Sequence, residues 1–102
     1  GIINWNWNGR RVYNFWRALN FPPFKNAVTY FEKNEIEIIK CKEIHSQKKE
    51  TYGKILSINK YGILVSCKGS DILLEKIKIN DKNIYYTELI KLSIEVGRIL
   101  GK

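Results

Sequence analysis

Three closely spaced strand-like segments between residues 52 and 79 constrain the fold of this chain more than any other feature. Residues 52–58 are rich in β-forming side chains and lead into residues 59–62, whose Asn and Gly tolerate the left-handed backbone of a tight turn. Residues 63–67 return with alternating side chains, and residues 72–79 make the third pass after a second turn. Three such strands bury too little surface to be stable alone, so the flanking segments must cover them.

The segments before this sheet predict two further strands. Residues 27–31 and 36–41 have strand patterns and are joined by a short polar turn. The apolar phase shifts between Ile38 and Ile39, which indicates a bulge of the kind that curls a sheet toward closure. Residues 42–50 are polar and unpatterned and predict a mobile loop. Together these segments predict a mainly β protein whose sheet curls into a small barrel.

An amphipathic helix is predicted from Asn8, as its N-cap, to about Asn20. At 100° per residue its apolar positions occupy one third of the circumference and should cover the sheet: Val12, Phe15, Trp16 and Leu19. The opposite side carries Arg10, Asn14 and Arg17. This side is available to an anionic ligand, although Arg17 is equally suited to pairing with an acid of the protein body.

A second, short helix is predicted near the carboxyl end. Thr87 is a suitable cap, and Lys91 and Glu95 are spaced to pair on the outside. The face predicted to be buried carries Leu89, Leu92 and Val96.

Two tryptophans lie close together in the extended amino-terminal segment. Trp5 and Trp7 are both spaced to face one side of a strand. They suit either of two roles: hydrophobic anchors that hold this arm against the domain, or platforms on which nucleobases stack.

The net charge of +8 favours a polyanionic partner, because a field of that sign concentrates polyanions near the surface. The first 25 residues contain four basic residues and no acidic one. The alternative is that a composition rich in lysine and asparagine gives only a solvated surface.

Residue types for catalysis are scarce. His45 is the single histidine, which excludes a His/His metal pair, and Cys41 and Cys67 lie in separate predicted strands without paired-ligand spacing. We expect both cysteines to be free thiols in the core, no metal to be bound, and no small-molecule cofactor to be held by this chain. The residues therefore predict a basic binding module rather than an enzyme.

Length and hydropathy suggest a single domain over residues 1–102. No apolar run approaches the roughly 20 residues of a membrane span, so we expect a cytoplasmic location and no membrane partner. The chain begins at Gly1 without a methionine, which suggests a fragment of something longer.

Several short motifs, in this order, resemble the carboxy-terminal domain of the 10-formyltetrahydrofolate-dependent formyltransferases. They are Asn4-Trp5-Asn6-Trp7, Val12-Tyr13-Asn14-Phe15, Arg17-Ala18-Leu19, the two prolines before Ala27-Val28-Thr29, Gly53-Lys54-Ile55-Leu56, Tyr61-Gly62-Ile63-Leu64-Val65-Ser66-Cys67 and Gly97-Arg98-Ile99-Leu100-Gly101. The resemblance spans nearly the whole chain.

The resemblance implies an open OB-like Greek-key barrel with a preceding helix. It also implies that catalysis and 10-formyltetrahydrofolate belong to an amino-terminal Rossmann-like domain of the same polypeptide, which this chain lacks. In the members that act on initiator methionyl-tRNA, the barrel domain offers a basic surface to the tRNA. The candidates here, chosen on charge and position, are Arg10, Arg11, Arg17, Lys54, Lys76, Lys78 and Lys82, with Lys60 and Lys68 as weaker ones.

The sequence therefore leaves three alternative functions open. The first is a non-catalytic domain that helps bind an acceptor tRNA. The second is a structural domain of a sugar- or small-amine formyltransferase, since the Trp5-Asn6-Trp7 motif is closer to the sugar-modifying branch of the family. The third is a free-standing OB-type single-strand binder that uses Trp5 and Trp7.

Overall fold

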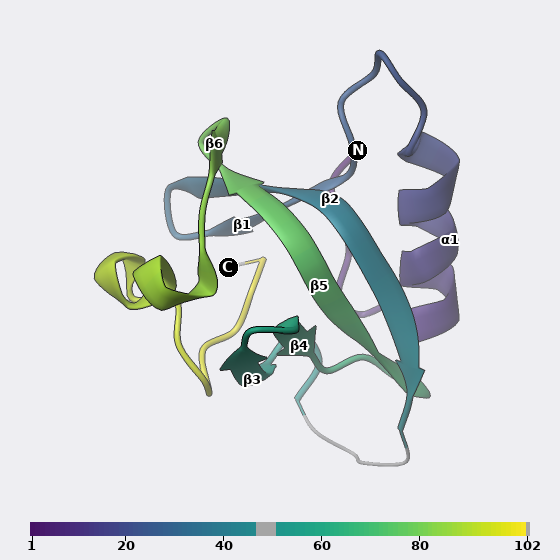
Figure 1. The fold of residues 1–102 in the computed structure, drawn as a ribbon. Helices are drawn as coiled ribbons and strands as arrows, with labels where there is room; N and C mark the ends of the chain where they lie inside the picture. The colour runs from purple at the N-terminus through teal and green to yellow at the C-terminus, as the bar shows by residue number, and fades with distance from the viewer. Residues whose placement is uncertain (47–50, 102) are drawn as a thin grey trace.

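The computed structural model describes residues 1–46 and 51–101 and is mainly β (Figure 1). Its elements in chain order are α1 (Gly9–Leu19), β1 (Val28–Phe31), β2 (Asn34–His45), β3 (Ile55–Asn59), β4 (Gly62–Val65), β5 (Ser70–Ile79), β6 (Lys82–Asn83) and the 3-10 helix η1 (Tyr86–Leu92). The predicted class, a mainly β fold with a preceding helix and a short carboxy-terminal helix, is confirmed.

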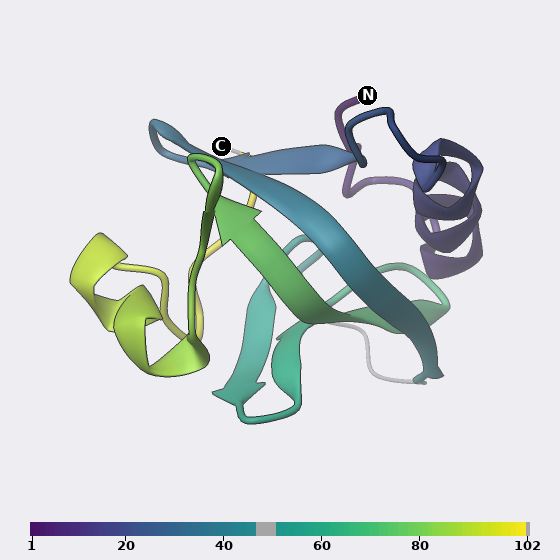
Figure 2. The same ribbon diagram turned by 45° about the horizontal axis from the view of Figure 1, so that its top comes forward.

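The strands form one antiparallel sheet in the order β1-β2-β5-β4-β3, with β6 paired to β5. Strands β3, β4 and β5 follow one another as hairpins, and β2 lies beside β5, which is a Greek-key arrangement. The two longest strands, β2 and β5, form a curved pair across the centre of the molecule, with α1 on one side and η1 on the other (Figure 2). The predicted Greek-key connection is therefore present.

The predicted bulge lies where the sequence pattern placed it. The register between β2 and β5 shifts between Ile38 and Lys40 and again between Lys40 and Cys41, which leaves Ile39 without a cross-strand partner. Ile38 and Cys41 both face the core in spite of their odd spacing. The extra residue increases the local bend, which is what a curled sheet requires.

Strand β2 extends further than predicted. The loop was expected to begin at Lys42, but residues 42–45 continue the ladder with β5, ending at the pair His45 and Ser70. Pairing with the long strand β5 prevails over the low β-propensity of these polar residues, since that propensity depends strongly on context. The rest of the predicted loop, residues 47–50, lies outside the described residues.

The carboxy-terminal segment spans the gap between β3 and β1. Gly97 N donates to Ile55 O (2.8 Å), and Ile55 N donates to Arg98 O (2.8 Å). On the other side, Gly101 N donates to Tyr30 O (2.7 Å), and Leu100 is buried between the two strands' ends. Residues 97–101 therefore take the place of a strand in closing the barrel.

The core consists mainly of isoleucine, leucine and valine side chains from β2, β4 and β5, joined by Val12 and Trp16 of α1. Cys41 and Cys67 belong to this core as free thiols, as predicted. Burial raises the pKa of each to about 12. They are therefore neutral, small apolar side chains at physiological pH.

Helix α1 has the predicted cap and the predicted faces. Asn8 Oδ1 accepts a hydrogen bond from Arg11 N (2.8 Å). Val12 is fully buried, and Trp16 Nε1 donates to Ile38 O (2.8 Å) at the bulge of β2. Gly9 starts the helix against β5, where an added Cβ would lie 2.0 Å from Ser70 Oγ.

The amino-terminal arm is anchored by Trp5. This side chain is 5% exposed, and its Nε1 donates to the buried Thr29 Oγ1 (2.9 Å). Trp7 is half-buried, with its ring 5.1 Å from that of Phe15 in an edge-on contact. The anchoring interpretation is therefore confirmed for Trp5, and the prediction that Trp5 offers a stacking platform is wrong because a buried indole cannot reach a base.

The carboxy-terminal helix differs in detail from the prediction. It is a 3-10 helix that starts at Tyr86, after Tyr85 rather than after Thr87, and ends at Leu92 because Ser93 adopts a left-handed conformation with φ 61°. Leu89 is buried as expected, whereas Val96 lies beyond the helix and is 59% exposed. Among the described residues, neither helix has the length and apolarity needed to cross a membrane.

Candidate nucleic-acid interface

Three of the predicted basic residues lie together on the exposed side of α1. Arg10, Arg11 and Arg17 are all exposed, because the helix turns its apolar stripe toward β2 and β5. Arg11 lies over the Trp7 ring, 4.2 Å from guanidinium carbon to ring centroid, and Arg17 lies 5.9 Å from the Tyr13 ring. These aromatic contacts orient the two guanidinium groups, and no acid within residues 1–46 and 51–101 pairs with either of them.

Arg10 is neutralised by an acid of the protein body. Its Nε lies 3.1 Å from Glu43 Oε1, and the other carboxylate oxygen of Glu43 accepts from Ser70 Oγ (2.7 Å). The pairing that the sequence suggested for Arg17 is thus made by Arg10 instead. The free positive charge of α1 therefore lies at Arg11 and Arg17.

A second group of basic residues lies on the outer face of β5 and its neighbours. Lys76 is exposed on β5, directly across from Lys40 of β2. Two like charges in direct cross-strand positions repel each other, so an anion bound between them would relieve the repulsion. Sequence reasoning missed Lys40, because the charges of residues 26–50 cancel and only the shifted register brings this lysine to Lys76.

The remaining sheet candidates differ in how much charge they offer. Lys78 is half-buried and lies across from Glu37, which offsets part of its charge. Lys82 is exposed on β6, opposite Ile79.

Lys54 lies apart from both groups. It precedes β3, is half-buried, and forms an isolated bridge with Ile99 of the carboxy-terminal segment.

The two weaker candidates lie on turns. Lys68 is exposed, and its carbonyl accepts from Gly9 N (2.9 Å), which brings it to the start of α1 beside the arginines. Lys60 is exposed on the β3–β4 turn, with its Nζ 5.3 Å from the centroid of the Tyr61 ring. Lys68 thus extends the helix group, and Lys60 lies near the sheet group.

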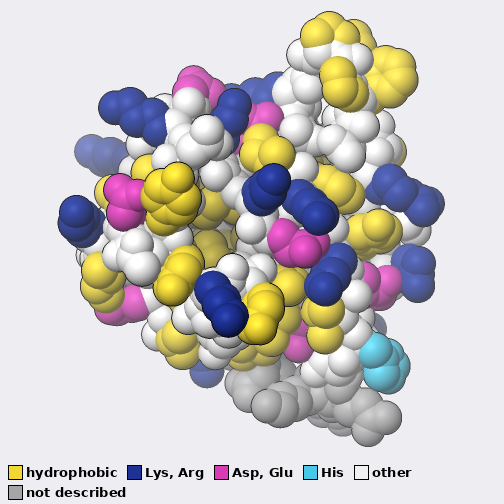
Figure 3. Space-filling model, viewed as in Figure 1, with side chains coloured by type: hydrophobic (Ala, Val, Ile, Leu, Met, Phe, Trp, Pro, Cys, Tyr) yellow, Lys and Arg dark blue, Asp and Glu magenta, His cyan; other side chains and the backbone are white. Residues whose placement is uncertain are grey.

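The space-filling view shows basic side chains over both α1 and the β2–β5 region, with acidic and hydrophobic side chains between them (Figure 3). The structure therefore does not gather all the predicted residues into one uninterrupted patch. It separates them into a helix group (Arg11 and Arg17, with Lys68) and a sheet group (Lys40, Lys76, Lys78 and Lys82, with Lys60).

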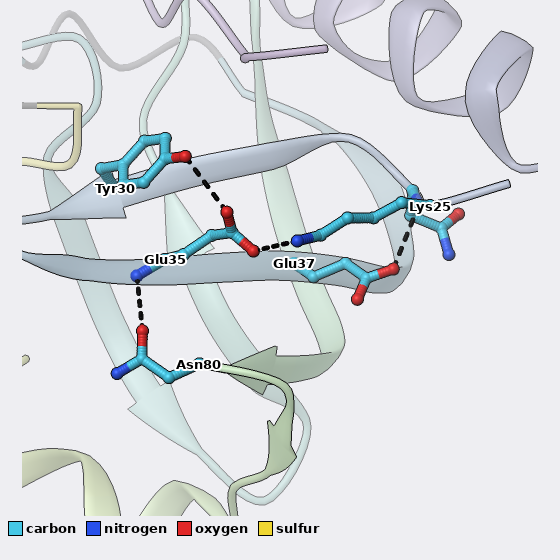
Figure 4. Close-up of polar contacts among 6 residues, drawn as sticks. Lys25, Tyr30, Glu35, Glu37 and Asn80 are labelled. Carbon is cyan, nitrogen blue, oxygen red and sulfur yellow. Dashed lines mark hydrogen bonds and ion pairs between the residues drawn. The ribbon is translucent and has the colours of Figure 1, made fainter.

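Around Glu35, a network of polar contacts joins charged residues that belong to neither basic group (Figure 4). Glu35 pairs with Lys25 Nζ and accepts from Tyr30 Oη (3.1 Å), while its backbone N donates to Asn80 Oδ1 (3.1 Å). The hydrogen bond from Lys25 holds the pKa of Glu35 below its ordinary value, and the same contact raises the pKa of Lys25. Lys25 is therefore committed to bracing the segment before β1.

A cleft beside the sheet group was not predicted. It lies between η1 and the β3–β4 turn, with a volume of about 410 Å³, and its rim carries Tyr85, Tyr86 and Lys60. Tyr85 is 76% exposed and Tyr86 45%. A signal was present in the sequence as two adjacent tyrosines before a helix, but only the fold places them opposite the basic turn.

These observations define a class: a small OB-like barrel domain of basic net charge with a helix on its side. The chain belongs to the family described as formyl transferase, C-terminal domain, whose model matches residues 1–91. The resemblance inferred from the motifs is thereby confirmed.

Similar proteins of two kinds are found. The chain is 29% identical over 102 residues to a methionyl-tRNA formyltransferase of Clostridium botulinum, covering 98% of this chain and 32% of that protein. A methionyl-tRNA formyltransferase of Clostridium perfringens is 30% identical, with 96% of this chain and 32% of that protein covered. The bifunctional polymyxin resistance protein ArnA of Wigglesworthia glossinidia brevipalpis is 34% identical over 103 residues, covering 100% of this chain and 14% of that protein. The chain thus spans about a third or less of these relatives.

Proposed function

We propose that this chain is a non-catalytic domain that helps a formyltransferase hold its acceptor, and that the acceptor is initiator methionyl-tRNA. The observation that carries the proposal is the pair of exposed arginines, Arg11 and Arg17, on the outer side of α1. They occur in a chain of net charge +8 that is similar to methionyl-tRNA formyltransferases.

The chemistry of such a surface suits a phosphate backbone. Arginine and lysine side chains that neutralise phosphates release counterions, which gives binding without sequence preference. The formyl transfer itself and its donor, 10-formyltetrahydrofolate, are assigned in this proposal to the catalytic domain of the whole protein. The role proposed for the described residues of this chain is only to position the tRNA.

The experiment is a titration of the 102-residue chain with initiator tRNA at about 50 and 200 mM salt. We expect affinity to fall about 100-fold across this range, as for about four phosphate contacts. The double variant Arg11→Glu/Arg17→Glu should bind much more weakly at low salt, whereas Lys33→Glu, on the β1–β2 turn and a member of neither group, should not. Weak binding that ignores salt would count against the proposal.

A second candidate function has an observation of its own, the similarity to the ArnA protein over the full chain. In that function the domain braces the catalytic part of a formyltransferase whose acceptor is a sugar or small amine. The whole enzyme distinguishes the two. If the acceptor is tRNA, Arg11→Glu/Arg17→Glu should raise the KM for tRNA; if the domain only braces the enzyme, turnover of the small acceptor should be unchanged.

A further inference from the structure

The cleft between η1 and the β3–β4 turn combines aromatic, apolar and basic groups in one place. Its floor is formed by core side chains, among them Ile63, Leu74 and Leu89. Tyr85 and Tyr86 line the cleft as well, and both are exposed at the surface. Figure 3 shows the hollow on this face of the molecule, between η1 and β5.

The aromatic side chains suit a flat ring. Tyr85 is 76% exposed and Tyr86 45%, and Tyr61, on the neighbouring turn, is 66% exposed. Exposed tyrosine faces above an apolar floor bind nucleobases by stacking, which every base can do through its π-face. A base inside a duplex is already stacked, so this chemistry selects an unpaired nucleotide.

The charges at the rim suit a phosphate on either side of that base. Lys60, on the β3–β4 turn, and Lys76, on β5, both line the cleft. Lys76 also lies directly across from Lys40, and this unfavourable pair of like charges gains from a bound anion. A nucleotide within an RNA strand brings a phosphate on each side of its sugar, which matches two basic rims.

Glu75 gives the cleft a means of choosing between bases. The shifted register pairs Lys76 with Lys40 and Leu74 with Cys41, so Glu75 has no cross-strand partner among the described residues, and it lines the cleft. A carboxylate accepts hydrogen bonds from the exocyclic amino group of cytosine. Uracil has no such group, so the carboxylate disfavours it.

We propose that this cleft holds one unpaired, amino-bearing nucleotide of the bound RNA, with its base on Tyr85 and Tyr86 and its phosphates near Lys60 and Lys76. This inference rests on the proposed tRNA-binding function and adds a local, base-selective contact to it. It assigns stacking to the tyrosines of the cleft rather than to the tryptophans of the amino-terminal arm.

The test measures binding of fluorescein-labelled oligocytidine and oligouridine, each about 10 nucleotides long, by fluorescence anisotropy. In the 102-residue chain, Tyr85→Leu/Tyr86→Leu should weaken oligocytidine binding about 5- to 100-fold, the range expected for one lost stacked base. Tyr52→Leu, at an exposed tyrosine outside the cleft, is the matched control. Glu75→Gln should reduce the preference for oligocytidine over oligouridine.

Lys60→Gln provides a second variant that does not touch the core, because Lys60 is exposed on a turn. It should weaken oligocytidine binding severalfold, whereas Lys33→Gln should not. These variants keep the test valid if the tyrosine variant fails to fold.

The outcomes separate this inference from the proposed function. Suppose that the native chain binds tRNA in a salt-dependent way, but that the Tyr85/Tyr86 and Lys60 variants bind tRNA and oligocytidine as tightly as the native chain does. The cleft is then not the nucleotide site, and the proposal of a basic tRNA-binding surface is unaffected. If the native chain binds no RNA, both proposals fail. Displacement of oligocytidine from the cleft by polyglutamate as readily as by unlabelled RNA would show that the cleft selects acidic peptides instead.

Discussion

Trp5 is the residue on which the amino-terminal arm depends. Its Nε1 donates to Thr29 Oγ1 at 2.9 Å, and both side chains are buried. Trp5→Phe should lower the free energy of unfolding by about 1–3 kcal/mol, since it leaves the Thr29 hydroxyl without its donor. Urea unfolding followed by circular dichroism measures this loss.

Thr29→Val offers the matching control for this hydrogen bond. It removes the acceptor and leaves the indole N–H unpaired, so it should be destabilising by itself. The double variant should lose less stability than the two single losses combined, because neither partner is then left unpaired. Strict additivity would show that the hydrogen bond contributes nothing and that Trp5 acts through packing alone.

Glu35 should give the protein an acid-dependent part of its stability. The hydrogen bond from Lys25 lowers the pKa of Glu35 below its ordinary value of 4.5. A carboxyl group with a lowered folded-state pKa stabilises the fold above its unfolded pKa, and this contribution disappears as the pH falls through the folded value. Glu35→Gln should therefore destabilise the protein near neutral pH and match it at low pH.

Unfolding in urea at a series of pH values between about 7 and 3 follows this difference. Lys25→Gln should reduce it by removing the cause of the lowered pKa. A difference between native protein and Glu35→Gln that stays constant with pH would contradict the prediction.

Individual residues were predictable where one local rule decides them. Asn8 as a cap and the thiols of Cys41 and Cys67 as core atoms follow from local pattern and burial tendency. Lys40 was not predictable as a partner of Lys76, because their proximity depends on a register shift between strands far apart in the chain. Glu43 as the partner of Arg10 required the extended end of β2, which the polar sequence concealed.

Among the elements, α1 is the one whose stability depends most on a single cap. Asn8 Oδ1 accepts from Arg11 N, and no acidic residue in the first turn supports it. Asn8→Ala should cost about 1 kcal/mol, whereas Asn8→Ser should retain most of the stability because serine is also a good N-cap. The midpoints of urea unfolding for the three proteins measure the order.

In the strand pair β2–β5, we expect replacement of one lysine of the Lys40–Lys76 pair to raise stability and to weaken RNA binding. Replacing one member of the Lys40–Lys76 pair removes a like-charge repulsion, so Lys40→Gln should stabilise the protein by about 0.2–1 kcal/mol at low salt. The same change should weaken RNA binding.

Lys33→Gln, on the β1–β2 turn, is the control for this pair and should alter neither property. If Lys40→Gln leaves both stability and affinity unchanged, the two lysines do not act as a pair.

Elements were predictable in existence and less so in their limits. Strand-forming side chains between turns identified β1, β4 and β5. Strand β4 alternates between buried and half-buried residues, whereas β1 and the start of β5 are buried on consecutive residues and so on both faces. The end of β2 and the start of η1 were missed. The end of β2 depends on its pairing with β5. The start of η1 depends on a local pair of hydrogen bonds, from Glu88 N to Tyr85 O and from Tyr85 N to Glu88 Oε1.

At the scale of the whole molecule, the sequence predicted that the sheet curves into a barrel. It did not predict which segment closes the barrel. The bulge in β2 was visible in the apolar phase, whereas the filling of the gap between β3 and β1 by residues 97–101 was not. Residues 97–101 hold only Ile99 and Leu100 as apolar residues between two glycines. This pattern allows an extended piece, but it is too short to show which strands the segment joins. The division of the basic surface into a helix group and a sheet group likewise required the fold.

That closing segment has a practical consequence for any shortened version of the protein. The family model ends its match at residue 91, yet Ile94 and Leu100 are buried beyond it. A fragment trimmed to that boundary would expose the apolar ends of β1 and β3 along with their unpaired amide groups. We expect this fragment to be recovered largely as aggregates. Size-exclusion chromatography beside the 102-residue chain measures this. A monodisperse product would show that residues 92–102 are dispensable for folding.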